Sequence, residues 1–313
     1  MKILFPINNK RVDGPENWRK ILMNELSKKN NIEVFGGWNI FQISKKVYWA
    51  DIIHSYTQSP LTIFSIFLGK LFNKKIIHTV HGDYHAEKEN KKGIKKILWV
   101  PFNRICTSSA DKIIFPSKYL YQKITKKEPA LKYKSEIILN GLDFKKIRSI
   151  KGYKKEDLGL KTNDFLIVEV TNFNLKQKVK GIDVLIKDFN NLNKKRKNYH
   201  LFIVGGGKLL ESYKEKYQSE KIKFLGFKKN AIKYIQACDL FAHYSFLDSF
   251  GYVILEALAL KKPVFAFGSK AFKEILPEER LKTNKNLNKN LNKNLREFSS
   301  EQMAKKYNGA YSS

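Results

Sequence analysis

Short apolar runs alternate with amphipathic stretches along most of the chain. Runs that end in a polar or glycine residue predict buried strands, whereas apolar positions three and four residues apart predict helices. Repeated alternation of the two kinds of element is typical of α/β domains with a parallel sheet. Strands are expected at residues 2–7, 32–35, 50–55, 75–80, 165–170, 200–204, 222–227, 240–243 and 264–267, and helices at 17–29, 61–71, 181–192, 231–237 and 252–260.

A lysine-rich stretch divides this pattern into two halves. Residues 145–161 contain Gly152 and Gly159 among many lysines, and a new strand–helix pattern begins at residue 165. A chain of 313 residues is long enough for two domains of ordinary size. We therefore expect two α/β domains joined near this stretch.

The most informative polar positions lie between the last two expected strands. Asp248 falls in the loop before the helix at 252–260, Ser249 is a candidate N-cap, and Pro263 ends that helix. Glu256 lies inside the same apolar helix, where a carboxylate is costly unless it has a partner. Either Glu256 pairs with a lysine on the helix surface or it binds a ligand, and the apolar residues on both of its flanks favour a ligand.

This segment resembles the signature of retaining GT-B glycosyltransferases of family 4. The family pattern is Glu-x-Phe-Gly, four residues, Glu-Ala, and then Ala-x-Gly-x-Pro-Val. The chain departs from it where Asp248 replaces Glu and where Lys261 replaces Gly. The matching positions, which keep the seven-residue gap between the two acids, are Asp248, Phe250, Gly251, Glu256, Ala257, Ala259, Pro263 and Val264.

Weaker matches to the same family extend over nearly the whole chain. The resemblance implies an α/β protein of the GT-B class, with two doubly wound Rossmann-like domains and a cleft between them. The expected domains are residues 1–148 on the acceptor side and residues 149–297 on the nucleotide-sugar donor side. Residues 298–313 resemble the closing helix of the family, which packs back on the first domain.

The resemblance also implies how the second domain holds a nucleotide-activated sugar. Glu256 would bind the ribose hydroxyls, and Asp248 would bind a sugar hydroxyl. Phe250 and Gly251 would offer backbone N–H groups near the positive end of the following helix. Lys180 would neutralise the leaving diphosphate as its charge develops in the transition state.

Two further stretches belong to the expected donor side. One is a lysine-rich loop in which this chain has Asn where the family usually has Arg, so a neighbouring lysine is expected to supply the charge. The other is a glycine turn, which permits close approach of a nucleotide but is neither a dinucleotide fingerprint nor a P-loop. The residues concerned are Asn172, Lys176, Lys178 and Lys180 in the first stretch and Gly205 and Gly206 in the second.

Two residues of the first domain are expected to face the acceptor. Gly14 lies in the polar loop after the first strand, where the family usually has Gly-Gly, although an ordinary turn explains it equally well. His81 follows the strand at 75–80 in a Thr-Val-His-Gly sequence that resembles the Thr-x-His of the family. His85 is a competing candidate, and a satisfied loop histidine is the structural alternative.

The chain is strongly basic, with 60 Lys and Arg against 29 Asp and Glu and a formal net charge of +31. This charge predicts attraction to an anionic membrane, a lipid-linked phosphate, a nucleotide or a nucleic acid, although lysines spread over solvated faces explain most of it. Because the lysines are not clustered with interleaved aromatics, we expect no nucleic-acid partner. The helix at 61–71 and the run at 88–102 are candidate membrane contacts, with buried core and a solvated face as the respective alternatives.

The cysteines, the N-terminus and one absent motif indicate in which compartment the protein lies and whether its chemistry needs a metal. Cys106 and Cys238 form no CxxC and no Cys/His cluster, which argues for a reducing compartment. The N-terminus is too polar for a signal peptide, and no stretch is apolar enough to span a bilayer. We therefore expect a cytoplasmic protein, with peripheral attachment to the inner membrane face as an option. Since the chain contains no Asp-x-Asp, we expect neither a metal nor another cofactor.

Together these observations predict a retaining glycosyltransferase of polysaccharide biosynthesis, a hexosyltransferase of class EC 2.4. It would move a hexose-type sugar from a UDP- or GDP-sugar to a glycan or lipid-linked acceptor. A non-catalytic GT-B protein that binds glycans or assists another transferase is the first alternative, because of Asn172 and Lys261. A basic nucleic-acid-binding protein and a GT-B epimerase or phosphorylase are the others.

Overall fold

A computed structural model of the chain describes residues 1–7, 14–37, 39–277 and 295–313, and it divides into two compact units. The first unit comprises Met1–Asp143 together with Arg296–Ser313, and the second comprises Phe144–Leu295. The chain thus leaves the first unit at Asp143, a few residues before the boundary expected at 148. Its C-terminal segment belongs to the first unit.

The first unit is built on a six-stranded sheet whose paired strands run parallel. The strand order is β2-β1-β3-β4-β5-β6, so the order reverses between β1 and β3. The strands are β1 (Lys2–Pro6), β2 (Asn31–Phe35), β3 (Ile52–Ser55), β4 (Lys75–Thr79), β5 (Lys112–Phe115) and β6 (Ser135–Ile137). The helices are α1 (Gly14–Leu26), α2 (Ile40–Trp49), α3 (Pro60–Leu71), α4 (Tyr84–Glu87), α5 (Ile94–Ser109), α6 (Lys118–Lys127) and α13 (Ser300–Ser312).

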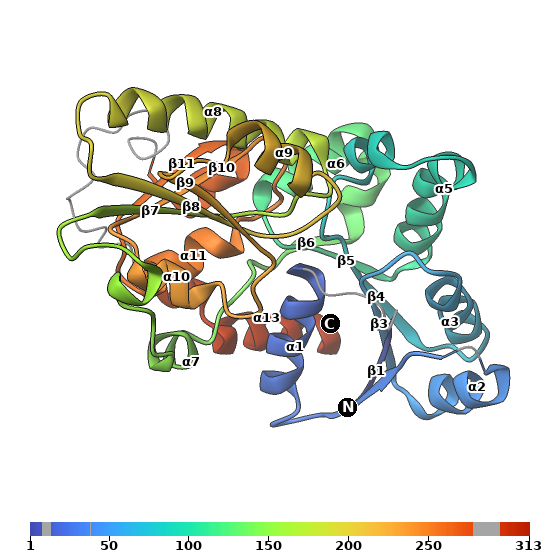
Figure 1. The fold of residues 1–313 in the computed structure, drawn as a ribbon. Coiled ribbons are helices and arrows are strands. Elements are labelled where there is room, and N and C mark those ends of the chain that lie inside the picture. Colours follow the sequence, from blue (N-terminus) through green and yellow to red (C-terminus); the bar gives the residue numbers. More distant parts are fainter. Residues whose placement is uncertain (8–13, 38, 278–294) are drawn as a thin grey trace. The chain divides into compact units, whose positions relative to one another are not determined.

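Helices cover both faces of this first sheet, as in a doubly wound domain (Figure 1). On one face, α2, α3, α5 and α6 contribute Ile43, Ile66, Cys106 and Ile124 to a common core with the strands. On the other face, α1 packs against α13. Both faces of the sheet are therefore buried, which explains why its strands read as short continuous apolar runs.

A buried hydrogen-bond network ties α13 to the first sheet. His54 of β3 contacts the Tyr311 hydroxyl through Nδ1 (2.6 Å) and the Thr79 hydroxyl through Nε2 (2.8 Å). The Thr79 hydroxyl also lies 3.1 Å from the hydroxyl of Tyr307. Burial holds the pKa of His54 well below its ordinary value, so the ring is neutral and needs one donor and one acceptor. The two hydroxyls supply both.

The second unit is built on a five-stranded sheet whose paired strands also run parallel. The strand order is β11-β10-β7-β8-β9, so the order reverses between β7 and β10. The strands are β7 (Phe165–Val170), β8 (Tyr199–Val204), β9 (Ile222–Gly226), β10 (Leu240–Ser245) and β11 (Val264–Gly268). The helices are α7 (Phe144–Ser149), α8 (Lys176–Asn193), α9 (Leu210–Tyr217), α10 (Ile232–Ala237) and α11 (Tyr252–Ala259).

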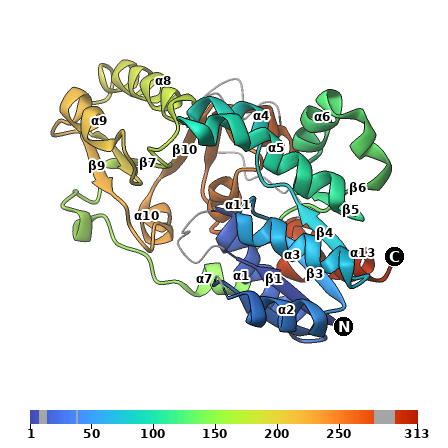
Figure 2. The same ribbon diagram turned by 90° about the vertical axis from the view of Figure 1, so that its right-hand side faces the viewer.

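The second sheet is likewise covered on both faces, with α8 and α9 on one and α10 and α11 on the other (Figures 1 and 2). The side chains of Ile182 and Phe189 from α8 and Leu210 from α9 pack with strand residues in one apolar cluster. α10 and α11 contact each other as well as β7 and β10 respectively. The two doubly wound domains expected from the sequence are thus confirmed.

Two expected details are wrong, and several helices, α2 among them, were not expected. α8 begins at Lys176 and not at residue 181, so the basic stretch before it is a helical turn and not a loop. Ser249 does not cap α11, because Gly251 occupies the N-cap position. α2 has no counterpart among the expected helices, because only Ile43 and Val47 of this short helix are buried and its apolar stripe is thin.

The His54 network predicts a cost for removing one hydroxyl. In a Tyr311→Phe variant the buried His54 Nδ1 loses its partner, so the free energy of unfolding should fall by about 1–3 kcal/mol. Urea unfolding followed by circular dichroism measures this change. Tyr133→Phe is the matched control, because that ring is 96% exposed. Equal stability of the two variants would contradict the account.

Candidate functional site

The strand order of the second unit indicates where a ligand binds. In a doubly wound parallel sheet, ligands bind outside the carboxyl ends of the two strands at which the order reverses. Here these ends lead into residues 171–175 after β7 and residues 246–251 after β10. The first loop carries Asn172 and leads into α8, and the second carries Asp248 and leads into α11. Most of the expected donor-side residues therefore lie in or just after these two loops, and Gly205 and Gly206 follow the neighbouring β8.

Four charged side chains form a continuous chain at the reversal. Lys178 Nζ of α8 lies 3.2 Å from Asp248 Oδ2. The same oxygen lies 3.4 Å from His243 Nε2 of β10, and His243 Nδ1 lies 2.8 Å from Glu169 Oε1 of β7. The other oxygen of Glu169 accepts a hydrogen bond from the backbone N–H of Tyr244 (2.9 Å). We call the four side chains the ion chain.

The charges within the ion chain depend on one another. Glu169 and His243 are both 0% exposed. Burial favours the neutral imidazole, but the carboxylates of Glu169 and Asp248 outweigh it and raise the pKa of His243 to about 9. Burial also favours the protonated form of Asp248, but Lys178 and His243 outweigh it and hold the pKa of Asp248 well below its ordinary value. At neutral pH, His243 is therefore a cation between two carboxyl groups.

The ion chain and the surrounding backbone hold Asp248 in one orientation. Its Oδ2 is held by Lys178 and His243, and its Oδ1 accepts a hydrogen bond from the Phe250 amide (3.3 Å). Its backbone carbonyl accepts a hydrogen bond from the Ser269 hydroxyl (2.9 Å). An ionised carboxylate has further lone pairs with which it can accept hydrogen bonds from ligand hydroxyls.

Glu256 differs from Asp248 in its surroundings. Its side chain on α11 is half-buried, and its carboxylate forms no hydrogen bond or ion pair with any residue that the structure describes. Burial alone raises the pKa of Glu256 to about 7. Pairing with a lysine on the helix surface therefore finds no support in this part of the chain. A carboxylate held in this way is destabilising, and such groups are common at ligand sites.

The loop between the two acids turns sharply at Gly251. This residue has a φ of 100°, in the left-handed region that favours glycine, and it directly precedes α11. Phe250 is 2% exposed, so its ring anchors the turn in the core. The turn presents the amino end of α11, where backbone N–H groups have no partner within the helix. Such an end favours a polar or anionic ligand.

The three candidate lysines of α8 have different surroundings. Lys178 is half-buried and paired with Asp248, whereas Lys176 and Lys180 are exposed and form no ion pair with other described residues. Gly181 explains how closely α8 approaches β10, because a Cβ atom at this position would lie 2.1 Å from the Tyr244 carbonyl oxygen. Gly181 thus allows α8 to pack closely on β10, and the side chain of Lys180 lies in solvent.

The glycine turn after β8 packs directly on the loop after β7. Gly205 has a φ of +147°, and a Cβ atom there would lie 1.7 Å from the Thr171 carbonyl oxygen. The Gly206 carbonyl accepts a backbone hydrogen bond from the same loop (3.0 Å). Asn172 is exposed, and its side-chain oxygen accepts the N–H of Asn174 (2.7 Å), so this residue shapes the loop.

In the first unit, His81 lies among aromatic side chains. Its ring centroid is 4.4 Å from that of Trp18 and 6.2 Å from that of Tyr56. Tyr56 follows β3, beside the reversal of strand order in this sheet, and its hydroxyl donates a hydrogen bond to Glu16 (2.9 Å). Gly14 is the first residue of α1, the helix that carries Trp18 and Glu16.

The competing candidate, His85, has a structural role. Its Nε2 lies 2.8 Å from Glu128 Oε1, and Arg104 Nε lies 3.1 Å from the same oxygen. His85 is therefore a histidine whose hydrogen bond is made within the protein, which is the structural alternative to a role in ligand binding. Of the two histidines, His81 is the one whose ring lies near Tyr56, which follows β3 at the reversal of strand order.

Sequence analysis missed Glu169 and His243. Each is a polar residue inside an apolar strand, which is the same signal that singled out Glu256 in its helix. What the pattern of one strand cannot show is that β7 and β10, far apart in sequence, are neighbours in the sheet. Burying Glu169 or His243 alone would be costly, but the two side chains hydrogen-bond each other because β7 and β10 are adjacent.

Two absences within the described ranges concern metals and membranes. No group of three or more His, Cys, Asp or Glu side chains among these residues is placed to hold a metal ion. Chemistry without a metal stays a prediction. None of the helices in the same ranges is both long and apolar enough to cross a bilayer.

Two family models match the chain. The model described as "Glycosyl transferases group 1" matches residues 151–310, and that described as "Glycosyltransferase Family 4" matches residues 21–146. The first match covers about half of the chain and includes the ion chain and Glu256.

Individual relatives are distant in sequence. The chain is 23% identical over 295 residues to the alpha-monoglucosyldiacylglycerol synthase of Streptococcus pneumoniae, covering 88% of this chain and 66% of that protein. It is 24% identical over 311 residues to the O-antigen biosynthesis glycosyltransferase WclY of Escherichia coli, covering 89% and 83%. The chain spans 66%, 60% and 58% of the lengths of the first three curated relatives, which are longer proteins.

A solved structure shares the fold over the whole chain. The crystal structure of Anabaena Alr3699/HepE in complex with UDP and glucose has a TM-score of 0.75 and 18% sequence identity, covering 100% of this chain and 99% of that one.

The surroundings of Glu256 predict a pH-dependent gain in stability when its charge is removed. Burial raises the pKa of the Glu256 carboxyl from 4.5 to about 7. The free energy of unfolding that depends on this group is therefore highest below pH 4.5, where the carboxyl is protonated in both states, and it is lost as the pH rises through 7. A Glu256→Gln variant should therefore have a free energy of unfolding about 1–2 kcal/mol higher at pH 8.5, with a smaller gain at pH 6.

Urea unfolding at the two pH values tests this expectation. Glu220→Gln is the matched control, because Glu220 is exposed and precedes β9 at the opposite edge of the sheet. A Glu256→Gln variant that is no more stable than the parent at pH 8.5 would contradict the account of this carboxylate.

Proposed function

Because the chain belongs to the glycosyl transferases group 1 family, we propose that it transfers a sugar from a nucleotide-sugar donor to a glycan or lipid-linked acceptor. The observation that carries the proposal is the pair of acids at the reversal of strand order in the second unit. Asp248 is held ionised by the ion chain, and Glu256 is held without a protein partner in the described residues. Asp248 is fixed in place by protein groups, whereas the carboxylate of Glu256 can pair with a ligand.

Glu256 is suited to bind the two ribose hydroxyls of the nucleotide. A carboxylate can accept a hydrogen bond with each oxygen, and neighbouring hydroxyls can donate to both. Because the pKa of Glu256 is about 7, hydrogen bonds from the ribose hydroxyls of a bound nucleotide sugar would favour the ionised carboxylate and lower this pKa. Donor binding would then relieve the cost of burying this carboxylate.

Asp248 and the amino end of α11 are suited to hold the sugar. The carboxylate oxygens would accept hydrogen bonds from sugar hydroxyls, and the turn at Gly251 would offer backbone N–H groups. Because Lys178 and His243 fix the carboxylate before a ligand arrives, little ordering is left for the binding step. Such preorganisation favours both affinity and rate.

Lys180 is suited to neutralise the leaving diphosphate. Lys178 is engaged by Asp248, whereas Lys180 extends into solvent from the first turns of α8. Charge develops on the diphosphate as the bond to the sugar breaks, so a nearby ammonium group stabilises the transition state more than the ground state. Lys176 and the amino end of α8 would add to the positive electrostatic potential around the diphosphate. Asn172 supplies no charge, so the lysines take the part that an arginine has in the family pattern.

The donor and acceptor are proposed from the relatives. Alr3699/HepE was crystallised with UDP and glucose, so we propose UDP-glucose as the first donor to test. Retention is proposed from the resemblance of the Asp248–Glu256 segment to the retaining family pattern. The relatives are named for glycolipid and O-antigen synthesis, so we propose a glycan or a lipid-linked saccharide as the acceptor. His81 and Gly14 of the first unit would face this acceptor.

A non-catalytic role is less well supported. A protein that only binds glycans has no use for a costly half-buried carboxylate beside a four-membered ion chain. This chain has both, together with two exposed lysines on α8. The departures at Asn172 and Lys261 leave these groups intact.

Nucleotide binding tests the donor site. UDP at about one hundred times its Kd should stabilise the folded protein by about 2.7 kcal/mol, seen as a rise in the thermal midpoint. The rise should be lost in Glu256→Ala and kept in the control Glu220→Ala. GDP, ADP and CMP at the same concentration identify the base, because the preferred nucleotide gives the largest rise.

Transfer itself needs a second assay with labelled UDP-glucose and a membrane lipid extract as acceptor. The proposal predicts label in the lipid fraction with the parent and a large loss with Lys180→Ala. No thermal response to any nucleotide would overturn the donor site. A response without transfer to any glycan or lipid would instead favour an accessory role.

A further inference from the structure

One buried hydroxyl at the reversal of strand order in the second unit has no partner among the described residues. Thr171 directly follows β7, at the start of the loop that leads into α8. The residue is only 7% exposed, and its Oγ1 forms no hydrogen bond within the described ranges. A buried hydroxyl that stays unpaired lowers the stability of the folded protein, so its presence requires a physical reason.

The other buried threonines in this part of the chain all use their hydroxyls. Each hydroxyl pairs with a side chain or donates to a backbone carbonyl at 2.8–3.1 Å; the residues are Thr57, Thr62, Thr79, Thr107 and Thr125. Thr171 is the exception among the described threonines that are buried. Packing alone does not explain it, because valine has the same shape and would fill the space without an unpaired hydroxyl.

The backbone of Thr171 shows on which face of the sheet its side chain lies. Its N–H donates to the Val204 carbonyl (3.0 Å), so the ladder between β7 and β8 continues one residue beyond β7. Side chains alternate between the two faces along a strand, which places Ile167, Glu169 and Thr171 on one face. Ile167 packs with α8 in the apolar cluster, so this is the face that α8 covers. The Thr171 hydroxyl therefore shares a face with Glu169 of the ion chain and lies nearer the carboxyl edge.

Close packing of the glycine turn holds Thr171 in place. The carbonyl of Thr171 is covered by Gly205, at a distance that a side chain on Gly205 would not allow. Its N–H is bonded to β8, so both backbone groups of the residue are fixed within the sheet. Little ordering is therefore left for a hydrogen bond between this hydroxyl and a ligand.

The amino end of α8 offers further hydrogen-bond donors at the other end of the same short loop. No side chain of the described residues caps this end at Leu175. A helix of 18 residues has a dipole that favours an anion at its amino end. Lys176 and Lys180 are exposed in its first turns. A hydroxyl, backbone N–H groups and ammonium groups are the donors from which phosphate oxygens accept hydrogen bonds.

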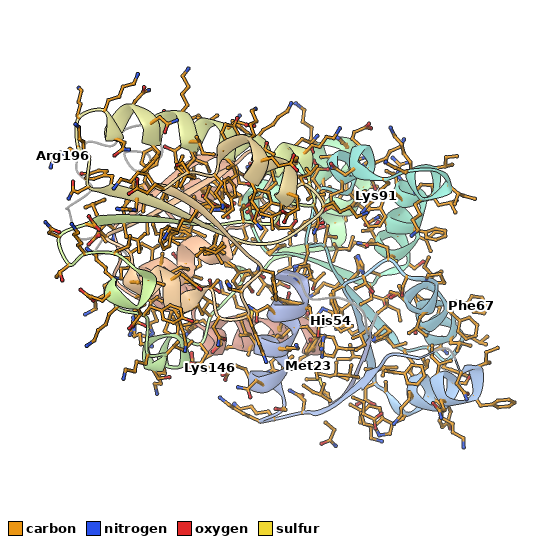
Figure 3. All side chains as sticks on the ribbon, viewed as in Figure 1. Met23, His54, Phe67, Lys91, Lys146 and Arg196 are labelled. Atoms are coloured by element: carbon orange, nitrogen blue, oxygen red, sulfur yellow. The ribbon has the colours of Figure 1, made fainter. Side chains whose placement is uncertain are left out.

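The basic residues at the other end of α8 are too far away to take part. The 18 residues of α8 make a helix about 27 Å long. Arg196 follows the carboxyl end of this helix, and Figure 3 shows it at the outer edge of the second unit. An anion at the loop after β7 is thus distinct from one attracted to Lys194, Lys195 and Arg196.

We propose that Thr171 is a ligand-contact residue of the donor site and that its hydroxyl donates a hydrogen bond to an oxygen of the donor diphosphate. The inference rests on the proposed function, in which Glu256 and Asp248 bind the ribose and the sugar. Neither carboxylate can serve the diphosphate, because like charges repel, whereas a hydroxyl can donate to it. The bond would be charge-assisted, and it would satisfy the hydroxyl that the folded protein leaves unpaired. Thr171 would thus supply a donor in the loop where Asn172 replaces the arginine of the family pattern.

An ordered water is the main alternative explanation. A buried hydroxyl can be satisfied by a water that bridges it to a second polar group. Such a water would belong to the folded protein without a ligand, so removing the hydroxyl would lower stability and leave ligand affinity unchanged. Under the proposal the hydroxyl is unpaired until the diphosphate binds, so removing it lowers affinity and not stability. The two explanations predict opposite results for one substitution.

Replacing Thr171 by valine separates the two explanations, because valine keeps the shape and lacks the hydroxyl. The Thr171→Val variant should have a thermal midpoint no lower than that of the parent. In isothermal titration calorimetry it should bind UDP about tenfold less tightly, because a hydrogen bond to a charged group is lost. Its affinity for inorganic pyrophosphate should fall by a similar factor. Thr171→Ser keeps the hydroxyl and should bind UDP within about twofold of the parent.

Two control variants test buried hydroxyls and general charge. Thr79→Val removes a buried hydroxyl that contacts His54 and Tyr307, so it should lower the thermal midpoint and leave the affinity for UDP unchanged. Lys195→Ala removes an exposed lysine beyond the carboxyl end of α8 and should leave the affinity for pyrophosphate unchanged.

Three results would refute the contact and leave the donor site standing, because Glu256→Ala tests that site separately. The first is a Thr171→Val variant that binds UDP and pyrophosphate as tightly as the parent. The second is a Thr171→Val variant that loses stability without losing affinity, as a bound water would require. The third is a Thr171→Ser variant that binds UDP as weakly as Thr171→Val. A parent protein that binds neither UDP nor pyrophosphate would overturn the donor site and this contact together.

Discussion

The arrangement of the second unit depends on one buried ion pair, that between His243 and Glu169. A carboxylate in the middle of an apolar strand and an imidazole in the middle of the next are each costly alone, because neither can be hydrated. Together, at 2.8 Å, they satisfy each other, and the protonated imidazole also stabilises the ionised carboxylate of Asp248. The pair forms only because β7 and β10 are neighbours, which is also what creates the reversal of strand order at which ligands bind.

The rest of the site follows from this pair. Asp248 must be ionised to complete the partners of His243, and Lys178 completes those of Asp248. Gly181 allows α8 to approach β10 closely enough for Lys178 to reach the loop. Removing one member of a buried ion pair leaves an uncompensated charge, so each of these residues constrains the others. A carboxylate held in this way is ready for a ligand before the ligand arrives.

Much of the fold was predictable from the sequence, because apolar runs and amphipathic stretches report local structure. β7 was predicted to the residue, and the positions of Asp248 and Glu256 in the apolar pattern were enough to single out both acids. The thin apolar stripe of α2 and the cap at Gly251 were not predicted, because the local signals there are weak or point to another residue. Glu169 and His243 were missed for a different reason: their meaning depends on which strands are adjacent, and that information is tertiary.

Part of the candidate site is costly to the folded protein. Glu256 is held half-buried without a partner in the described residues. Here the sequence departs from the choice that would give the most stable protein. Such departures, when the residues around them obey the ordinary rules of packing, indicate function rather than poor folding.

The ionisation state of His243 tests the central claim most directly. The chain has six histidines, so a nuclear magnetic resonance titration of ¹³C-labelled histidine, with His243→Gln to assign the signal, isolates this imidazole. The ion chain predicts that His243 keeps its proton through neutral pH and titrates near pH 9. A titration near 6.5, the ordinary value, would show that Glu169 and Asp248 do not hold this charge and that the ion chain does not exist as described.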